Sequence, residues 1–168
     1  MKRILLIAMT LTAAWLCCGA VKDKAAELEL DKVIETIKQN KDADVVRLGR
    51  LGMSIFRIAL EEEGDDEEDK AILALMKDTK KMTIADYSDC FQADRVKYST
   101  SISQALTRHE IIIEIKDDDE TVTIYGIFDD KKGTVSDIVM YSPSDCSLIL
   151  FDGKYEASTI GNLLANEN

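Results

Sequence analysis

The chain contains few of the residue types that build catalytic and metal sites. Its 168 residues include one histidine, one proline, one tryptophan and four cysteines. A structural zinc site is not expected, because it needs closely spaced Cys and His ligands and no Cys-x-x-Cys pair occurs. Gly-x-Ser-x-Gly, Gly-x-Gly-x-x-Gly and phosphate-loop motifs are also missing. The sequence therefore predicts a protein that is not an enzyme and holds no cofactor or metal.

The single histidine and the single tryptophan add little chemistry. His109 lies between Arg108 and Glu110, which favour a solvated turn rather than a catalytic base. Trp15 lies in a segment that export would remove, so no tryptophan would remain as a platform for sugar. The carboxylates of Asp117–Glu120 are of the type that a glycosidase uses. A small hydrolase is therefore an alternative, although a polar hairpin turn explains these residues more simply.

Positive charge is scarce. The chain has 21 Lys and Arg against 32 Asp and Glu, a formal net charge of −11. Such a surface repels phosphate backbones and anionic lipid headgroups, so no nucleic-acid binding is expected. Cationic partners are favoured.

Negative charge is concentrated in Glu61–Asp69, which has eight carboxylates in nine residues. Calcium takes several oxygen ligands, so this acidic loop suggests a cation-binding protein as an alternative function. The spacing does not match the twelve-residue calcium loop, which needs acids at alternate positions. A dense run of like charge is typical of a solvated loop.

The first 20 residues are typical of an export signal. Lys2 and Arg3 precede the apolar run Ile4–Leu16, and small residues up to Ala20 provide a cleavage site. The run is short for a membrane span. We therefore expect a signal peptide over residues 1–20, a single domain over 21–168, and a periplasmic or extracellular location.

The four cysteines fall into two pairs. Cys17 or Cys18 would carry a lipid in the lipoprotein alternative, and only then would the protein be anchored to a membrane. Cys90 and Cys146 would remain after cleavage, in an oxidising compartment where a disulfide can form. Such a bridge closes a long loop and would add on the order of 4 kcal/mol. Two buried free thiols are the alternative.

The fold is organised around Glu110–Phe151, which predicts a four-stranded antiparallel meander. Residues in its strands alternate between apolar and polar, and acidic, Gly or Pro turns separate them. The predicted strands are Glu110–Lys116, Thr121–Phe128, Thr134–Tyr141 and Cys146–Phe151. A turn at Asp152-Gly153-Lys154 would close the last strand.

Helices and two further strands precede and follow the meander. Helical spacing of apolar residues predicts helices over Val21–Asn40, Leu48–Leu60, Lys70–Lys80, Asp89–Leu106 and Glu156–Leu164. The expected strands are Asp42–Arg47 and Lys81–Ser88. The prediction is an α+β fold in which the helices pack on one face of the antiparallel sheet. Candidate surface residues near strand ends are Asp86, Tyr87, Asp89 and Tyr125.

The layout resembles exported bacterial (Bacteroidetes-type) proteins of domain-of-unknown-function family 4252. The similar segments are Val45–Met53, Val122–Tyr125, Ser136–Val139 and Leu148–Lys154. Members of this family often look like neighbours of extracytoplasmic sigma factors and of their anti-sigma partners. The resemblance therefore implies an envelope-associated regulatory role, and it implies no catalytic residues. The leading hypothesis is a non-enzymatic binding or regulatory module that holds an envelope protein or peptide, through an edge strand of its sheet.

Overall fold

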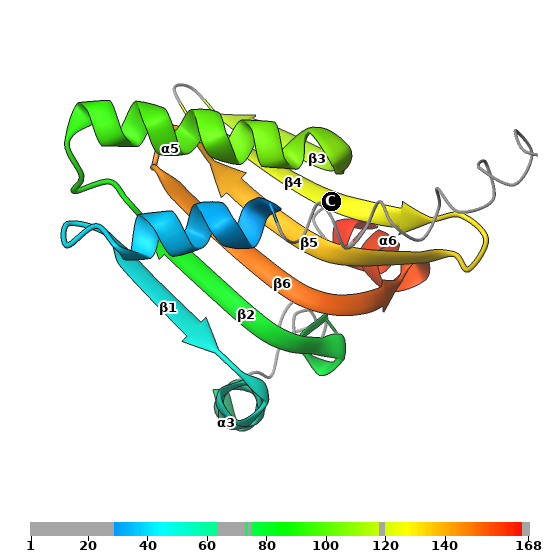
Figure 1. The fold of residues 1–168 in the computed structure, drawn as a ribbon. Helices are drawn as coiled ribbons and strands as arrows, with labels where there is room; N and C mark the ends of the chain where they lie inside the picture. Colours follow the sequence, from blue (N-terminus) through cyan, green and yellow to red (C-terminus); the bar gives the residue numbers. More distant parts are fainter. Residues whose placement is uncertain (1–28, 64–72, 74, 118–119, 166–168) are drawn as a thin grey trace, which may run out of the picture.

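A six-stranded antiparallel sheet forms the centre of the protein (Figure 1). The computed structural model describes residues 29–63, 73, 75–117 and 120–165. The strand order is β1-β2-β6-β5-β4-β3. The strands are β1 (Asp44–Leu48), β2 (Thr79–Asp86), β3 (Glu110–Asp117), β4 (Glu120–Asp129), β5 (Thr134–Ser142) and β6 (Ser147–Glu156).

The predicted meander is present as β3 to β6, which pair in sequence order. The expected strands before it are β1 and β2, and β2 pairs with β6. Several predicted boundaries were wrong by one to three residues, and the turn expected within β6 is absent. The expected turn at Asp152-Gly153-Lys154 is part of β6, which runs to Glu156 because β2 and β5 pair with it there.

The α+β fold class is confirmed, but the helices lie on both faces of the sheet rather than on one. A helix over residues 29–38 and α5 (Gln92–Ala105) lie in front of the sheet in Figure 1, and α6 (Ala157–Ala165) lies behind it. The cause is the apolar run in β6. Leu148 and Leu150 enter one core, whereas Ile149 and Phe151 enter the other. A strand that is apolar on both sides needs cover on both sides.

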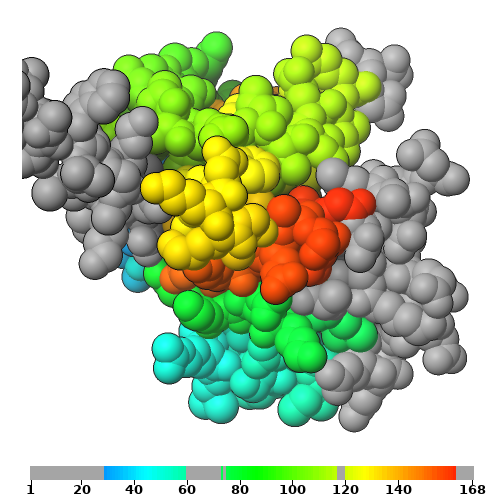
Figure 2. Space-filling view, turned by 90° about the vertical axis from the view of Figure 1, so that its right-hand side faces the viewer, coloured from blue at the N-terminus to red at the C-terminus, as the bar shows by residue number. Residues whose placement is uncertain are grey.

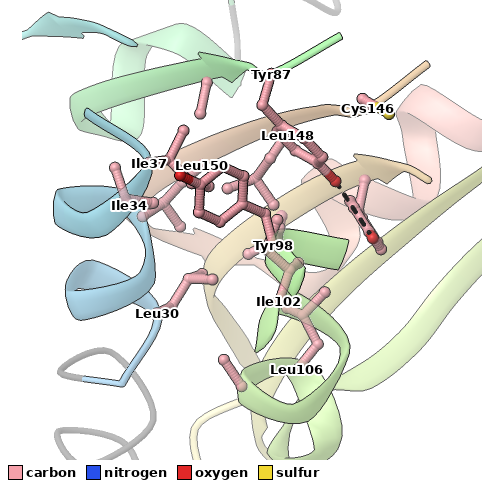
Figure 3. Close-up of a cluster of buried hydrophobic side chains, with 14 of the residues drawn as sticks. Leu30, Ile34, Ile37, Tyr87, Tyr98, Ile102, Leu106, Cys146, Leu148 and Leu150 are labelled. Carbon is pink, nitrogen blue, oxygen red and sulfur yellow. Dashed lines mark hydrogen bonds between the residues drawn. The ribbon is translucent and has the colours of Figure 1, made fainter. Parts of the chain in front are cut away.

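The first core lies between the sheet and the helices in front of it (Figure 3). Leu30, Ile34 and Ile37 are buried on the first helix, as their helical spacing predicts. Tyr98 and Ile102 of α5 are buried against the same cluster. The structure begins α5 at Gln92 without a side-chain cap.

The second core lies on the opposite face and is covered by α3 (Arg50–Glu63), α6 and a helical segment that ends at residue 78. Met53 of α3 and Tyr155 of β6 are fully buried there, and Met82 and Phe151 are buried in the same cluster. The helix α3 extends through the first three glutamates of the acidic run. Residues 64–69 of that run, and the expected signal peptide over 1–20, lie outside the described residues.

Gly153 sits where β2 and β6 slip in register, between Thr79 and Lys81 of β2. The ring of Tyr155 lies over Gly153, and the Tyr155 hydroxyl forms a 2.9 Å hydrogen bond with Thr79 Oγ1. Burial raises the pKa of Tyr155 to about 12. The bulge therefore requires glycine at position 153, because the Tyr155 ring fills the space that a side chain at this position would occupy.

We predict that Gly153→Ala destabilises the fold by about 1–3 kcal/mol, the usual cost of forcing a methyl group into a packed core. The new Cβ would press on the Tyr155 hydroxyl and lie 2.7 Å from the Asp78 carbonyl oxygen. Urea unfolding measures the loss. The matched control is Gly161→Ala in α6, where nothing lies within 4 Å of the added Cβ. Equal stabilities for the two variants would contradict the prediction.

Candidate functional site

The candidate surface residues predicted from the sequence do not form one site. Asp86 is exposed at the end of β2, where its Oδ1 accepts hydrogen bonds from the Ser88 amide (2.9 Å) and hydroxyl (2.7 Å). Asp89 is exposed in the loop that follows. Tyr125 is half-buried on β4 and packs against the first core. Since β6 and β5 separate β2 from β4, Tyr125 lies apart from Asp86 and Asp89.

The placement of Tyr87 at the surface was wrong, because its side chain is fully buried. Its ring packs edge-on against Tyr98, with centroids 5.8 Å apart. Its hydroxyl lies 3.1 Å from Ser99 Oγ and donates to the Tyr141 hydroxyl at 3.5 Å. Burial raises the pKa of Tyr87 above its ordinary value, so the phenol stays protonated. These hydroxyl groups link α5 to the sheet, and nothing in the local sequence pattern marks them as partners.

Two of the shallow hollows on the described surface are lined by polar side chains. The first lies beside α5 and is lined by Ser99, Thr100, Ser103, Gln104, Thr107, Tyr141 and Pro143. Its lining has no carboxylate. The second hollow is lined by two carboxylate side chains, those of Asp31 and Glu35, and by the cationic side chains of Lys32, Arg47 and Lys81. Arg47 pairs with Glu35 and lowers the pKa of that carboxyl. A general acid needs a raised pKa, so Glu35 does not fit that role.

Acidic residues in the described part of the chain do not form a metal site. No group of three or more His, Cys, Asp or Glu side chains converges among the residues that the structure describes. Most of the run Glu61–Asp69 and two residues of the turn Asp117–Glu120 lie outside them. Cation binding by the acidic run therefore stays a prediction from the sequence.

His109 is buried, contrary to the solvated turn that its charged neighbours favoured. It follows the short helix η1 (Leu106–Arg108), and its amide donates to the Leu106 carbonyl at 2.9 Å. Arg108 and Glu110 remain exposed, while the imidazole turns inward. Its Nδ1 has no hydrogen-bond partner among the described residues. Burial alone lowers the pKa of His109, so the ring is held in its neutral form.

Cys90 and Cys146 are buried thiols in the first core. The Cys90 thiol donates to the Asp42 carbonyl at 3.3 Å, and the Cys146 thiol lies 3.8 Å from the Pro143 carbonyl. Burial, with smaller contributions from Asp42 and other nearby groups, raises the pKa of Cys90. Low thiolate content makes such a cysteine a poor nucleophile.

The strand β3 provides the longest open edge of the sheet. Within the described part of the chain it pairs only with β4, and it is eight residues long, whereas the opposite edge strand β1 has five. Ile111 is 59% exposed and Ile115 is 45% exposed. Ile111 pairs with Tyr125, and after a register shift Ile113 pairs with Ile124, the adjacent residue of β4. Ile113 and Ile115 therefore lie on one face of the strand and Ile111 lies on the other. The Glu114 and Lys116 side chains form a 3.2 Å ion pair along the edge.

The profile of a protein family described as "Domain of unknown function (DUF4252)" matches residues 38–163. The match covers β1 to β6 and most of α6. Comparison with curated proteins and with solved structures finds no match. Among the described residues, no helix has the length and apolar character needed to cross a membrane.

We predict that stability falls as the pH drops below about 6.5, the ordinary pKa of histidine. The folded-state pKa of His109 is lower than this value, so between the two the unfolded chain binds the proton that the folded chain refuses. The slope approaches about 1.4 kcal/mol per pH unit for one proton. Urea unfolding between pH 7.5 and 5.5 measures it. The same slope in His109→Gln would show that His109 is not responsible.

We predict that Cys90 and Cys146 resist iodoacetamide in the folded protein and react after denaturation without reductant. Burial of both thiols and the raised pKa of Cys90 are the reasons. Intact mass counts the alkylated groups, and Cys90→Ser identifies one of them. Two further groups that become alkylated only after reduction would show the alternative, a disulfide between these residues.

Proposed function

Since the chain belongs to the DUF4252 family, we propose that it is an exported, non-enzymatic binding module of the cell envelope. Its ligand would be an extended segment of an envelope protein, added as a further strand beside β3. One observation carries the proposal: β3 is an eight-residue edge strand with two large apolar side chains exposed.

The backbone of β3 supplies the affinity in this proposal. An edge strand presents unpaired N–H and C=O groups, and an incoming strand satisfies them without any change to the sheet. The exposed Ile111 and Ile115 would each pack against a side chain of the added strand. Because they lie on opposite faces, they would contact side chains on both faces of it.

Charge narrows the choice of partner. Glu110 and Glu114 are exposed on β3, with Lys116 as the one cation of that strand. The formal net charge of −11 attracts cations over a longer range. The favoured ligand is therefore an extended segment that alternates apolar residues with Lys or Arg. Such a module would act by holding its partner in one conformation, which suits a regulatory role in the envelope.

We predict that affinity capture with crosslinking and mass spectrometry enriches one envelope protein, and that Ile111→Lys with Ile115→Lys reduces its recovery about tenfold. Loss of two apolar contacts and repulsion of a cationic ligand would supply the 1.4 kcal/mol that a tenfold change requires. The bait is the tagged protein mixed with the envelope fraction of the cells that make it.

The matched control is Phe91→Lys with Val96→Lys. These two residues are 73% and 61% exposed at the start of α5 and on it, and neither lies on a strand. Thermal melting verifies that both double variants are folded. Equal recovery with the edge and control variants would disprove binding at β3. No enrichment beyond an untagged sample would remove the support for partner binding altogether.

A further inference from the structure

The helix α3 lies at the end of the sheet opposite to β3, and it exposes an apolar stripe. Figure 2 shows β3 (yellow-green) at the top of the molecule and the cyan residues of β1 and α3 at the bottom. We propose that α3 is a self-association surface, on which the α3 helices of two copies of this chain pack antiparallel to each other.

The stripe consists of large side chains at helical spacing. Leu51 is 77% exposed, Ile55 62% and Ile58 57%. Their separations of four and three residues place them in one row along the helix. The other side of α3 faces the second core, where Met53 is fully buried and Phe56 packs beside it. The helix is therefore apolar on two sides, and one of them lacks a partner among the described residues.

The rotation of α3 about its own axis is fixed by polar contacts. Arg57 donates from Nη1 to the Met76 carbonyl (3.3 Å) and the Lys77 carbonyl (3.2 Å), and from Nη2 to Ser54 Oγ (3.2 Å). The two bonds to carbonyl groups tie α3 to the end of the helical segment before β2, and the bond to Ser54 holds the Arg57 side chain along the helix. Turning the stripe inward would break the bonds to the two carbonyl groups and expose Met53, so the stripe points away from the second core as a consequence of the fold.

The charges along α3 indicate a second copy as the partner. The helix begins at Arg50 and ends with Glu61-Glu62-Glu63, with no acid in its first turn and no base in its last. This order opposes the helix macrodipole, which favours acids at the start and bases at the end. An antiparallel copy would bring Arg50 of each chain toward the C-terminal end of the other α3, where the helix dipole is negative. The same arrangement repeats this attraction at both ends of the helix pair and aligns the two dipoles favourably.

The size of the surface predicts a weak, reversible dimer. A 14-residue helix is about 21 Å long. Two such helices bury less than the roughly 800 Å² per partner of a standard interface. The net charge of −11 on each copy opposes association, and salt at 0.15 M screens it beyond about 8 Å. A dimer at this end leaves both β3 edges free, so it would present two binding edges at once.

Sedimentation equilibrium of the purified protein at 0.15 M salt tests the proposal. Between about 5 and 500 µM, a range chosen to span a small interface, we expect the mass to rise from one chain toward two. Ile55→Lys should stay monomeric across this range, whereas Val96→Lys, an equally exposed apolar position on α5, should behave as the native chain does. A native protein that stays monomeric, or equal association of the two variants, would overturn the proposal.

Cysteine crosslinking tests the direction of the pairing. In the antiparallel arrangement, oxidation should join a Leu51→Cys chain to an Ile58→Cys chain in a mixture of the two. Val96→Cys, mixed in the same way, measures the background from the natural cysteines. Crosslinks confined to pairs of Leu51→Cys chains would show a parallel arrangement and contradict the proposal. Both experiments are independent of β3, so either proposal can fail alone.

Discussion

The structure depends on β6, a strand that is apolar on both faces and lies between β2 and β5. Leu148 and Leu150 are buried in one core and Phe151 in the other, with Ile149 packed against the latter. Burial of such a strand gains about 25 cal/mol for each Å² of apolar surface removed from water, but only if both faces are covered. The helix over 29–38 and α5 therefore cover one side, and α3 and α6 the other.

This arrangement also decides which parts of the sheet remain open. With β6 in the interior, β1 and β3 become the two edges, and no strand among the described residues pairs with the outer side of β3. On β3, only Ile112 packs against a core cluster, whereas Ile111 and Ile115 are exposed. The burial of β6 on both faces therefore explains both candidate surfaces, which are the edge of β3 and the exposed side of α3. Elements that stabilise the interior strands are at the periphery themselves, and α3 can bury only one of its two apolar sides.

Much of the secondary structure is predictable from the sequence, because apolar periodicity and turn residues are local signals. The meander strands and the helix with Leu30, Ile34 and Ile37 are examples. The position of β2 beside β6 is not predictable in this way, since it depends on pairing between residues about 70 positions apart. The second apolar face of β6 was visible in the run Leu148–Phe151, a pattern typical of strands buried on both sides.

The candidate site was less predictable than the fold. Tyr87 and His109 are polar residues beside charged neighbours, so local sequence favoured the surface. The burial of Tyr87 depends on Tyr98 and Ser99 of α5, which come from another part of the chain, and His109 turns inward where η1 ends. The importance of β3 arises from its edge position, and edge position follows from strand order rather than from composition. The alternation in Glu110–Lys116 predicts that Ile111, Ile113 and Ile115 share one face, and this prediction was wrong because a register shift after Ile111 moves Ile113 and Ile115 to the other face.

In the proposed function, an envelope protein binds along the open edge of β3. Amide hydrogen exchange, followed by mass spectrometry before and after mixing with the envelope fraction, tests it most directly. If the claim is correct, the peptide that covers Glu110–Asp117 exchanges more slowly in the bound protein, while the peptide that covers Asp44–Leu48 is unchanged. Unchanged exchange over Glu110–Asp117 in a protein shown to be bound would contradict it.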